Sequence, residues 1–213
     1  MTLLSLLSES SQRGSHLLHG VVVGLVTNNQ DPDNLGRVKV QFPWLSHENE
    51  SAWARIVTPM AGNNQGLYCL PEVDDEVLVM FEQGDPSYPF VLGALWNAKD
   101  KPPGNNSDGK NNVRLIQSRS GHQIRLNDED GNETIEIIDK TGKNKLVIDT
   151  SNNSIAITSD KDITLSAPKG TIKLEAKTIE LKSSTSTKLE AGAGLELKSN
   201  ATMNLKGAII NLN

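Results

Sequence analysis

The chain has 213 residues and a formal net charge of −5 at pH 7, with 36% hydrophobic but only 4% aromatic residues. Because nucleic acids are polyanions, a net acidic chain argues against general nucleic-acid binding. The sequence has no apolar run long enough to span a membrane, and its single cysteine, Cys69, excludes an intrachain disulfide.

Aromatic residues and charge divide the chain into two parts. All of the aromatic residues lie between positions 42 and 96. Residues 1–139 carry 10 basic and 19 acidic side chains, a net charge of −9, whereas residues 140–213 carry 11 basic and 7 acidic side chains, a net charge of +4. We therefore expect a globular core in the first part, with Cys69 as a small core residue, and a solvated outer surface on the second.

Residues 1–19 form an N-terminal segment that begins MTLLSLLSES. It lacks a basic region and its apolar stretch is too short for a signal peptide, which predicts a protein made in the cytoplasm. Two interpretations remain open, a short amphipathic helix that docks on a partner and a disordered end. His16 and His19 are three residues apart without a carboxylate or cysteine cluster, so no metal site is expected there.

Residues 20–97 show strand patterns separated by turn residues and no helical period. Five or six short strands in about eighty residues predict a small closed barrel of the OB type. Gly36 and Gly84 are expected to supply positive φ in turns, and Gly93 a bend within a strand. The expected strands are 20–27, 37–42, 51–59, 75–85 and 88–97, with a loop and a short strand at 61–71.

Residues 98–112 are polar and rich in proline and glycine, which predicts a linker that ends the barrel. Residues 113–143 are expected to form neck strands such as VRLIQS, HQIRLND and ETIEIID, which are separated by the turns SGH and DEDGN. The run from Asp128 to Asn132 faintly resembles a calcium loop, but it lacks the spacing and the closing glutamate. A hairpin turn is the preferred interpretation.

Residues 144–213 repeat a unit in which two apolar residues stand two positions apart and a polar turn follows. The steps between units are 7 to 9 residues, and the spacing of two is that of a strand with one dry face. The predicted core residues of this repeat are Leu146, Ile148, Ile155, Ile157, Ile163, Leu165, Ile172, Leu174, Ile179, Leu181, Leu189, Leu195, Leu197, Met203 and Leu205.

A single copy of this repeat has too small a core to stand alone. Two aliphatic residues per strand contribute roughly 3–6 kcal/mol on burial, whereas ordering the eight residues of a unit costs about as much or more. Unpaired sheet edges would also remain. A closed, stacked, strand-rich rod meets both needs, either as a single-chain β-helix or as an intertwined oligomer.

Several segments then share one order and spacing with a known family: LGRVKVQFPW (35–44), WARIVTP (53–59), residues 61–97, KPP (101–103), residues 116–150 and residues 159–183. Together they resemble the spike family of VgrG and phage baseplate assembly protein V. The resemblance implies an all-β fold, an N-terminal OB-fold barrel followed by an intertwined trimeric triangular β-helix. It also implies a homotrimer that forms the central spike of a contractile injection system, assembled in the cytoplasm and acting at the target cell envelope.

The resemblance further implies two protein partners and transient contact with the target membrane. Only about 19 residues precede the barrel, so a separate hub protein is expected at the N-terminal side. No histidine follows His122, so an iron-binding tip is not expected, and a PAAR-type tip protein should cover the apolar end. The expected hub contacts are Leu3, Leu4, Leu6 and Leu7, and the expected tip contacts are Ile209, Ile210, Asn211, Leu212 and Asn213.

No catalytic, cofactor-binding or metal site is expected, because the chain lacks a nucleophile elbow, a Walker loop, HExxH and CxxC. The acidic run 72–76 is interpreted as a solvated turn. The alternative function is a trimeric fibre or adhesin that binds a surface polymer through its OB head, with Trp44 and Trp53 stacking on sugars, although burial of both residues is preferred. A left-handed β-helix acyltransferase would need a six-residue period, which the steps of 7 to 9 disfavour.

Overall fold

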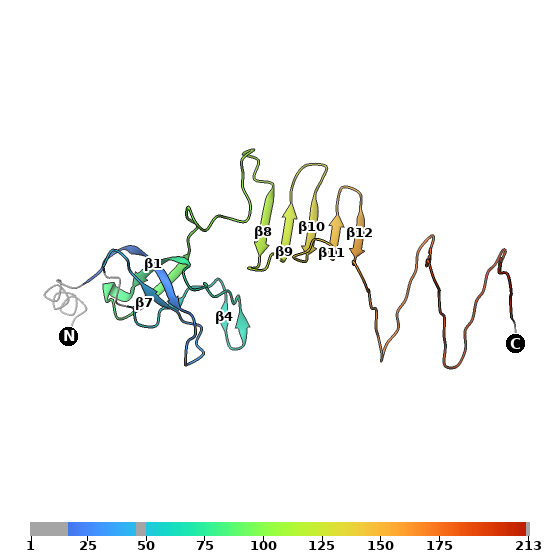
Figure 1. The fold of residues 1–213 in the computed structure, drawn as a ribbon, viewed down its shortest axis with the longest axis horizontal. Coiled ribbons are helices and arrows are strands. Elements are labelled where there is room, and N and C mark those ends of the chain that lie inside the picture. The colour runs from blue at the N-terminus through green and yellow to red at the C-terminus, as the bar shows by residue number, and fades with distance from the viewer. Residues whose placement is uncertain (1–16, 46–49, 212–213) are drawn as a thin grey trace, which may run out of the picture. The chain divides into compact units, whose positions relative to one another are not determined.

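The computed structural model describes residues 17–45 and 50–211, and these residues form an all-β protein (Figure 1). Apart from the short 3-10 helix η2 (Glu82–Gly84), their regular elements are strands. The chain divides into two compact units, one that ends at Asp160 and one that begins at Lys161. The expected all-β fold class is therefore confirmed.

The first sheet is a barrel of the predicted type. Its strands β1 (Val21–Asn28), β2 (Lys39–Gln41), β3 (Arg55–Ile56), β6 (Glu76–Phe81) and β7 (Pro89–Ala94) lie in the order β2-β1-β6-β7-β3. Neighbours are antiparallel except β3 and β7, which are parallel. A bridge between Val38 and Ala54 joins the β2 side to the β3 side and closes the sheet. A separate hairpin of β4 (Ala61–Gly62) and β5 (Gln65–Gly66) precedes β6.

Valine dominates the core of the barrel because alternate residues of its strands point inward. In β6, for example, Val77 and Val79 are fully buried, whereas Met80 is 40% exposed. Phe42 and Phe81 pack with their rings nearly edge to face, 5.6 Å between centroids. The buried core residues are Val26, Val38, Val40, Phe42, Ala54, Val77, Val79, Phe81 and Val91.

Glycines permit two of the sharp features of the barrel. Gly36 and Gly84 have φ of 70° and 84°, as predicted for turns, in the region where side chains are disfavoured. Gly24 in β1 allows a close approach that was not predicted, because a Cβ atom there would lie 2.3 Å from Cγ1 of Val40. The β1–β2 pairing therefore depends on a residue without a side chain.

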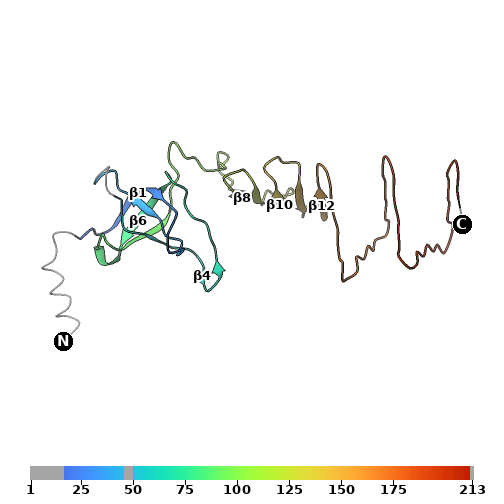
Figure 2. The same ribbon diagram turned by 60° about the horizontal axis from the view of Figure 1, so that its bottom comes forward.

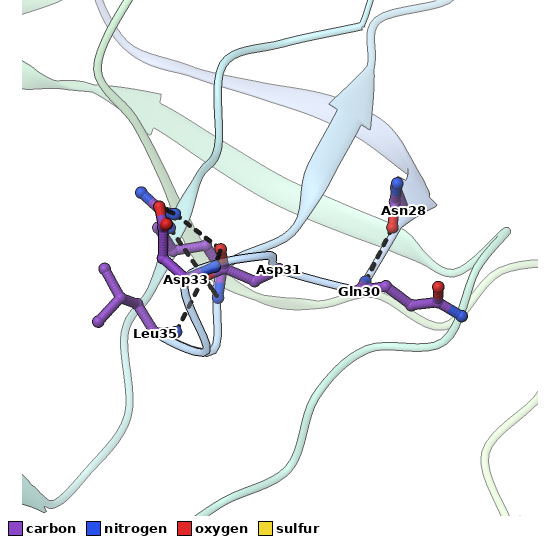
Figure 3. Close-up of polar contacts among 6 residues, drawn as sticks. Asn28, Gln30, Asp31, Asp33 and Leu35 are labelled. Carbon is purple, nitrogen blue, oxygen red and sulfur yellow. Dashed lines mark hydrogen bonds and ion pairs between the residues drawn. The ribbon is translucent and has the colours of Figure 1, made fainter.

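The loop between β1 and β2 is organised around Asp31 (Figure 3). Its carboxylate accepts hydrogen bonds from the backbone N–H groups of Asp33 and Leu35, at 3.1 and 3.0 Å, and from the Arg37 guanidinium, at 2.8 and 2.7 Å. The Asp31 side chain is only 3% exposed, and the Arg37 guanidinium holds the pKa of that carboxyl well below its usual range. Asp31 is therefore a charged anchor for an otherwise irregular loop.

The second sheet is an antiparallel meander of five strands, each paired with the next in sequence (Figures 1 and 2). The strands are β8 (Val113–Gln117), β9 (Gln123–Asn127), β10 (Thr134–Ile138), β11 (Lys145–Asp149) and β12 (Ser154–Thr158). The predicted hairpin turn at residues 128–132 is confirmed, with Gly131 at a φ of 77°. The sheet continues without a break from the predicted neck into the first two units of the C-terminal repeat.

Residues 161–211 form no strand within the single chain that the structure describes, and their side chains are almost all exposed. The chain runs there as extended segments joined by bends. The domain boundaries expected from the sequence, including the start of a needle at residue 144, remain predictions.

Candidate assembly interface

One face of the meander is almost entirely aliphatic. In an antiparallel pair, residues directly opposite each other project to the same side of the sheet, so the register identifies the members of each face. Two rows of paired residues cross all five strands on this side: Ile116, Ile124, Ile137, Leu146 and Ile157 in one, and Arg114, Leu126, Ile135, Ile148 and Ile155 in the other. We call the nine Ile and Leu residues of these rows the apolar face.

The apolar face is not covered within the single chain. Ile116 is 67% exposed and Ile155 is 70% exposed. Seven of the nine are exposed, and Leu146 and Ile148 are partly buried. Full burial of one exposed side chain of this kind is worth about 1.5–3 kcal/mol, so the face strongly favours association. An uncovered face of this kind is typical of a subunit that completes its core with other chains.

The opposite face of the meander is mostly polar. Its central row contains Leu115, Arg125, Glu136, Val147 and Ala156, and its two outer rows are polar except for Val113 and Ile138. Arg125 and Glu136 form an ion pair at 3.5 Å between Nη1 and Oε2. The sheet therefore has one side suited to water and one side suited to a protein interior.

Four of the predicted core residues, Leu146, Ile148, Ile155 and Ile157, belong to the apolar face. The other five members of this face lie in the predicted neck, and the sequence-based prediction did not assign them to a core. The signal that identifies them was present, since Ile124 and Leu126, like Ile135 and Ile137, stand two apart as the repeat residues do.

The remaining predicted core residues lie in the second unit, which by itself does not bring them together. Ile163 is 55% exposed and Leu181 is 72% exposed. Lysine and glutamate alternate with these apolar positions, as in the exposed ion pairs Lys173–Glu175 and Lys188–Glu190. In residues 161–211, apolar and polar residues still alternate, but these described residues have no partner strand in the single chain. Exposed side chains of the same set are Leu165, Ile172, Leu174, Ile179, Leu189, Leu195, Leu197, Met203 and Leu205.

The predicted partner contacts fall at the two ends of the chain. Leu3, Leu4, Leu6 and Leu7 lie outside the described residues, as do Leu212 and Asn213. Ile209 is 81% exposed and Ile210 is 50% exposed, and Asn211 is also exposed. The hub and tip contacts therefore stay predictions.

The barrel corrects two expectations about burial. Trp44 is 52% exposed and only borders the core, with its ring 6.2 Å from that of Phe42, so the preferred interpretation of a buried Trp44 is wrong. Cys69 is exposed because residues 67–69 follow the β4–β5 hairpin on the surface instead of entering the barrel. Trp53 is partly buried, with Arg37 and Lys39 at 5.8 and 5.6 Å from its ring centroid.

The acidic run 72–76 behaves as a turn. Asp75 accepts a hydrogen bond from the Glu72 amide at 2.8 Å, and Glu76 accepts one from Asn97 at 3.1 Å. Across residues 17–45 and 50–211, no group of three or more His, Cys, Asp or Glu side chains has the arrangement of a metal site. The same residues contain no helix that is long and apolar enough to cross a membrane.

Residues 22–96 match a family model described as the type VI secretion system/phage-baseplate injector OB domain. The chain is 35% identical over 111 residues to the type VI secretion system spike protein VgrG3 of Vibrio cholerae, which covers 48% of this chain and 11% of that protein. It is 33% identical over 138 residues to the spike protein VgrG1a of Pseudomonas aeruginosa, which covers 60% of this chain and 22% of the relative. The actin cross-linking toxin VgrG1 of V. cholerae is 32% identical over 111 residues, and this chain covers 10% of it. The chain thus spans only a small part of the length of these relatives.

Proposed function

Because residues 22–96 are an injector OB domain and the chain is related to VgrG spike proteins, we propose that three copies of it form the central spike of a contractile injection machine. The OB barrels dock on a baseplate hub, and the C-terminal repeats form a needle that is driven through a target envelope. The role is mechanical, and no residue is assigned a bond-breaking step.

The apolar face is the observation that carries the proposal. If three meanders form the walls of a triangular prism, their apolar faces point toward a common axis. Each of the layers β9 to β12 then contributes two aliphatic side chains per copy, six in all, and the β8 layer contributes Ile116 and Arg114. Such closure covers the uncovered aliphatic residues, which no rearrangement of a single flat sheet can do.

The second unit extends the same arrangement. Its apolar residues keep the spacing of two, but the described chain offers them no strand to pair with. We propose that residues 161–213 pair with the corresponding strands of the other two copies and form an intertwined β-helix. Interchain pairing would satisfy the backbone groups along the length of the needle.

Two partners complete the proposal. A hub protein contacts the N-terminal segment through Leu3, Leu4, Leu6 and Leu7. A PAAR-type tip protein covers residues 209–213, where Ile209 and Ile210 are exposed at the end of the needle. The spike is assembled in the cytoplasm as part of the particle and meets the target membrane after contraction.

Mass measurement of the full chain in solution tests the proposal. We expect three chains per particle by native mass spectrometry and by light scattering across micromolar concentrations. Deletion of residues 144–213 should weaken the trimer, because it removes two strands of the apolar face and the whole needle. A full-length chain that remains a folded monomer would contradict the proposed function.

The exposure of Trp44 favours one second candidate, a trimeric fibre that binds a surface polymer through its head. Trp53 is a poorer sugar platform because Arg37 and Lys39 lie over its ring. Trp44→Ala should abolish binding on a glycan array if the chain is such a fibre. If neither the wild-type trimer nor the Trp44→Ala trimer binds a glycan, the chain is not such a fibre.

A further inference from the structure

The turns of the meander alternate between the two ends of its strands (Figure 1). The sheet therefore has two sides formed by turns, and we call these sides its lateral edges, as distinct from its edge strands. Turns 128–133 and 150–153 lie at one edge, and turns 118–122 and 139–144 lie at the other. These edges differ in charge. We call the first the acidic edge and the second the basic edge, according to the residues that follow.

The acidic edge is dominated by the β9–β10 turn, which contains Asp128, Glu129, Asp130 and Glu133 and no basic residue. Asp128 pairs with Arg114. The side chains of Glu129, Asp130 and Glu133 make no hydrogen bond or ion pair within residues 17–45 and 50–211, and those of Glu129 and Asp130 are exposed. This edge therefore presents acidic groups whose charge is not balanced locally.

The basic edge carries Arg119 in the β8–β9 turn and Lys140 and Lys143 in the β10–β11 turn. The two turns contain one carboxylate, Asp139, which accepts hydrogen bonds from Thr141 and Asn144, and a second carboxylate, Asp160, lies beside the β10–β11 turn. Arg119 pairs with Glu72 and Lys143 with Asp160, each at 3.0 Å between exposed side chains, and exposed pairs of this kind contribute little. The Lys140 side chain forms no ion pair within the described residues, and the two exposed pairs of Arg119 and Lys143 can exchange for pairs with a neighbour.

Three-fold symmetry makes these edges meet. A rotation about the axis brings one edge of each copy against the other edge of the next copy, at the same height. The acidic turn lies between β9 and β10, whereas the basic turns lie one strand before and one strand after it, about 4.8 Å away along the axis in each direction. The acidic turn of one copy thus faces the gap between the two basic turns of its neighbour.

We propose that the acidic edge of each copy docks against the basic edge of the next copy, and that this contact selects the closed trimer in which all copies point the same way. The inference rests on the trimer proposed above and adds the partner surface. A two-fold pairing of identical edges would bring acidic groups against acidic groups, or basic against basic, which is unfavourable. The apolar face drives association, and the edges determine which arrangement results.

An edge-swapped chain tests the proposal. It combines Glu129→Lys and Asp130→Lys with Arg119→Glu and Lys140→Glu, so its edges complement each other but clash with the wild-type edges at both contacts. Wild-type and edge-swapped chains are co-expressed, one with an affinity tag, and the trimers are analysed by native mass spectrometry. We expect two kinds of homotrimer and a depletion of mixed trimers of about tenfold or more relative to random mixing.

The outward ion pair supplies the matched control. A chain with Arg125→Glu and Glu136→Arg also exchanges charges between neighbouring strands, but on the polar face of the same sheet. It should mix with the wild-type chain in random proportions. Random mixing of the edge-swapped chain as well would overturn the proposal while leaving the trimer intact, whereas a wild-type monomer would instead contradict the proposed function.

A neutral variant keeps the proposal testable if the swapped chain does not fold. With Glu129→Gln and Asp130→Asn, the edge loses charge without gaining a clash. The dissociation constant of the wild-type trimer should rise with salt concentration, and this dependence should be clearly weaker in the neutral variant. The same salt dependence in both would also contradict the docking of the edges.

Discussion

At the scale of single residues, charged side chains in this protein act as local anchors of irregular backbone. Asp31 accepts three backbone hydrogen bonds, from Asp33, Leu35 and Arg37, and two guanidinium hydrogen bonds in a loop that has no strand of its own. Arg37 in turn lies over the ring of Trp53, which links the loop to the barrel wall. The sequence shows that this loop is rich in turn residues, but not which of its four aspartate or asparagine side chains is the central acceptor.

Replacement of Asp31 by asparagine should loosen this loop. The change keeps the size of the side chain but removes the charge that balances Arg37 and one of the acceptor oxygens. We expect a lower Tm and faster hydrogen exchange at the Leu35 and Arg37 amides. Asp33→Asn is the control, since the Asp33 side chain is 66% exposed and should cause a smaller change in both measurements.

At the scale of elements, the positions of the strands could be predicted from the sequence, but the burial of side chains in the connecting segments could not. All the strands expected between residues 20 and 143 have a counterpart, because alternation of apolar and polar residues is a local property. The expected strand 51–59 is reduced to Arg55–Ile56, since its pairing depends on the parallel neighbour β7. The exposure of Trp44 and Cys69 was not predictable, because it depends on the path of surface segments and not on local pattern.

The turns of the meander predict a response of its stability to acid. Hydrogen bonds from Asn152 and Ser151 lower the pKa of Asp149 from its usual 3.8 to about 2. A folded-state pKa below the unfolded value means that Asp149 stabilises the sheet above about pH 4, and that this contribution is lost as the pH falls through 2.

Unfolding of the wild-type chain and of Asp149→Asn between pH 5 and pH 2 measures this contribution. The difference in stability between the two should be largest at pH 5 and should shrink toward pH 2, because asparagine does not titrate. Glu82→Gln is the control, because the exposed Glu82 side chain makes no hydrogen bond or ion pair within the described residues, and it should show no such convergence. A constant difference across this range would show that the turn does not depend on the Asp149 charge.

At the scale of the whole molecule, the barrel and the meander can be understood from one chain, but the C-terminal unit cannot. Its alternation predicts strands, yet backbone pairing between chains leaves no trace in the periodicity of a single sequence. The same reason explains why the sequence could not separate a single-chain β-helix from an intertwined trimer. The apolar face gives the proposed trimer a physical reason.

Replacement of Ile179 and Leu181 by aspartate should prevent formation of the needle. In the proposed β-helix, three copies would bury six carboxylates, each at a cost of several kcal/mol. The matched control carries Glu180→Asp and Lys182→Asp, which have the same spacing on the opposite side of the strand. Protease resistance of the C-terminal unit in the assembled particle should be lost in the first variant and retained in the control.

The strands of the meander pair with one another, whereas the described residues of the C-terminal unit do not pair within the single chain. This contrast predicts the order in which the two parts fold. Each strand from β8 to β12 pairs with its neighbour in sequence, so the meander forms from short-range contacts and can fold quickly within one chain. In the proposed trimer, residues 161–211 would gain their pairing only when three chains meet, at a rate that depends on concentration. If the proposed trimer forms, the barrel and the meander would therefore fold first, and the C-terminal unit would fold last and more slowly in dilute solution.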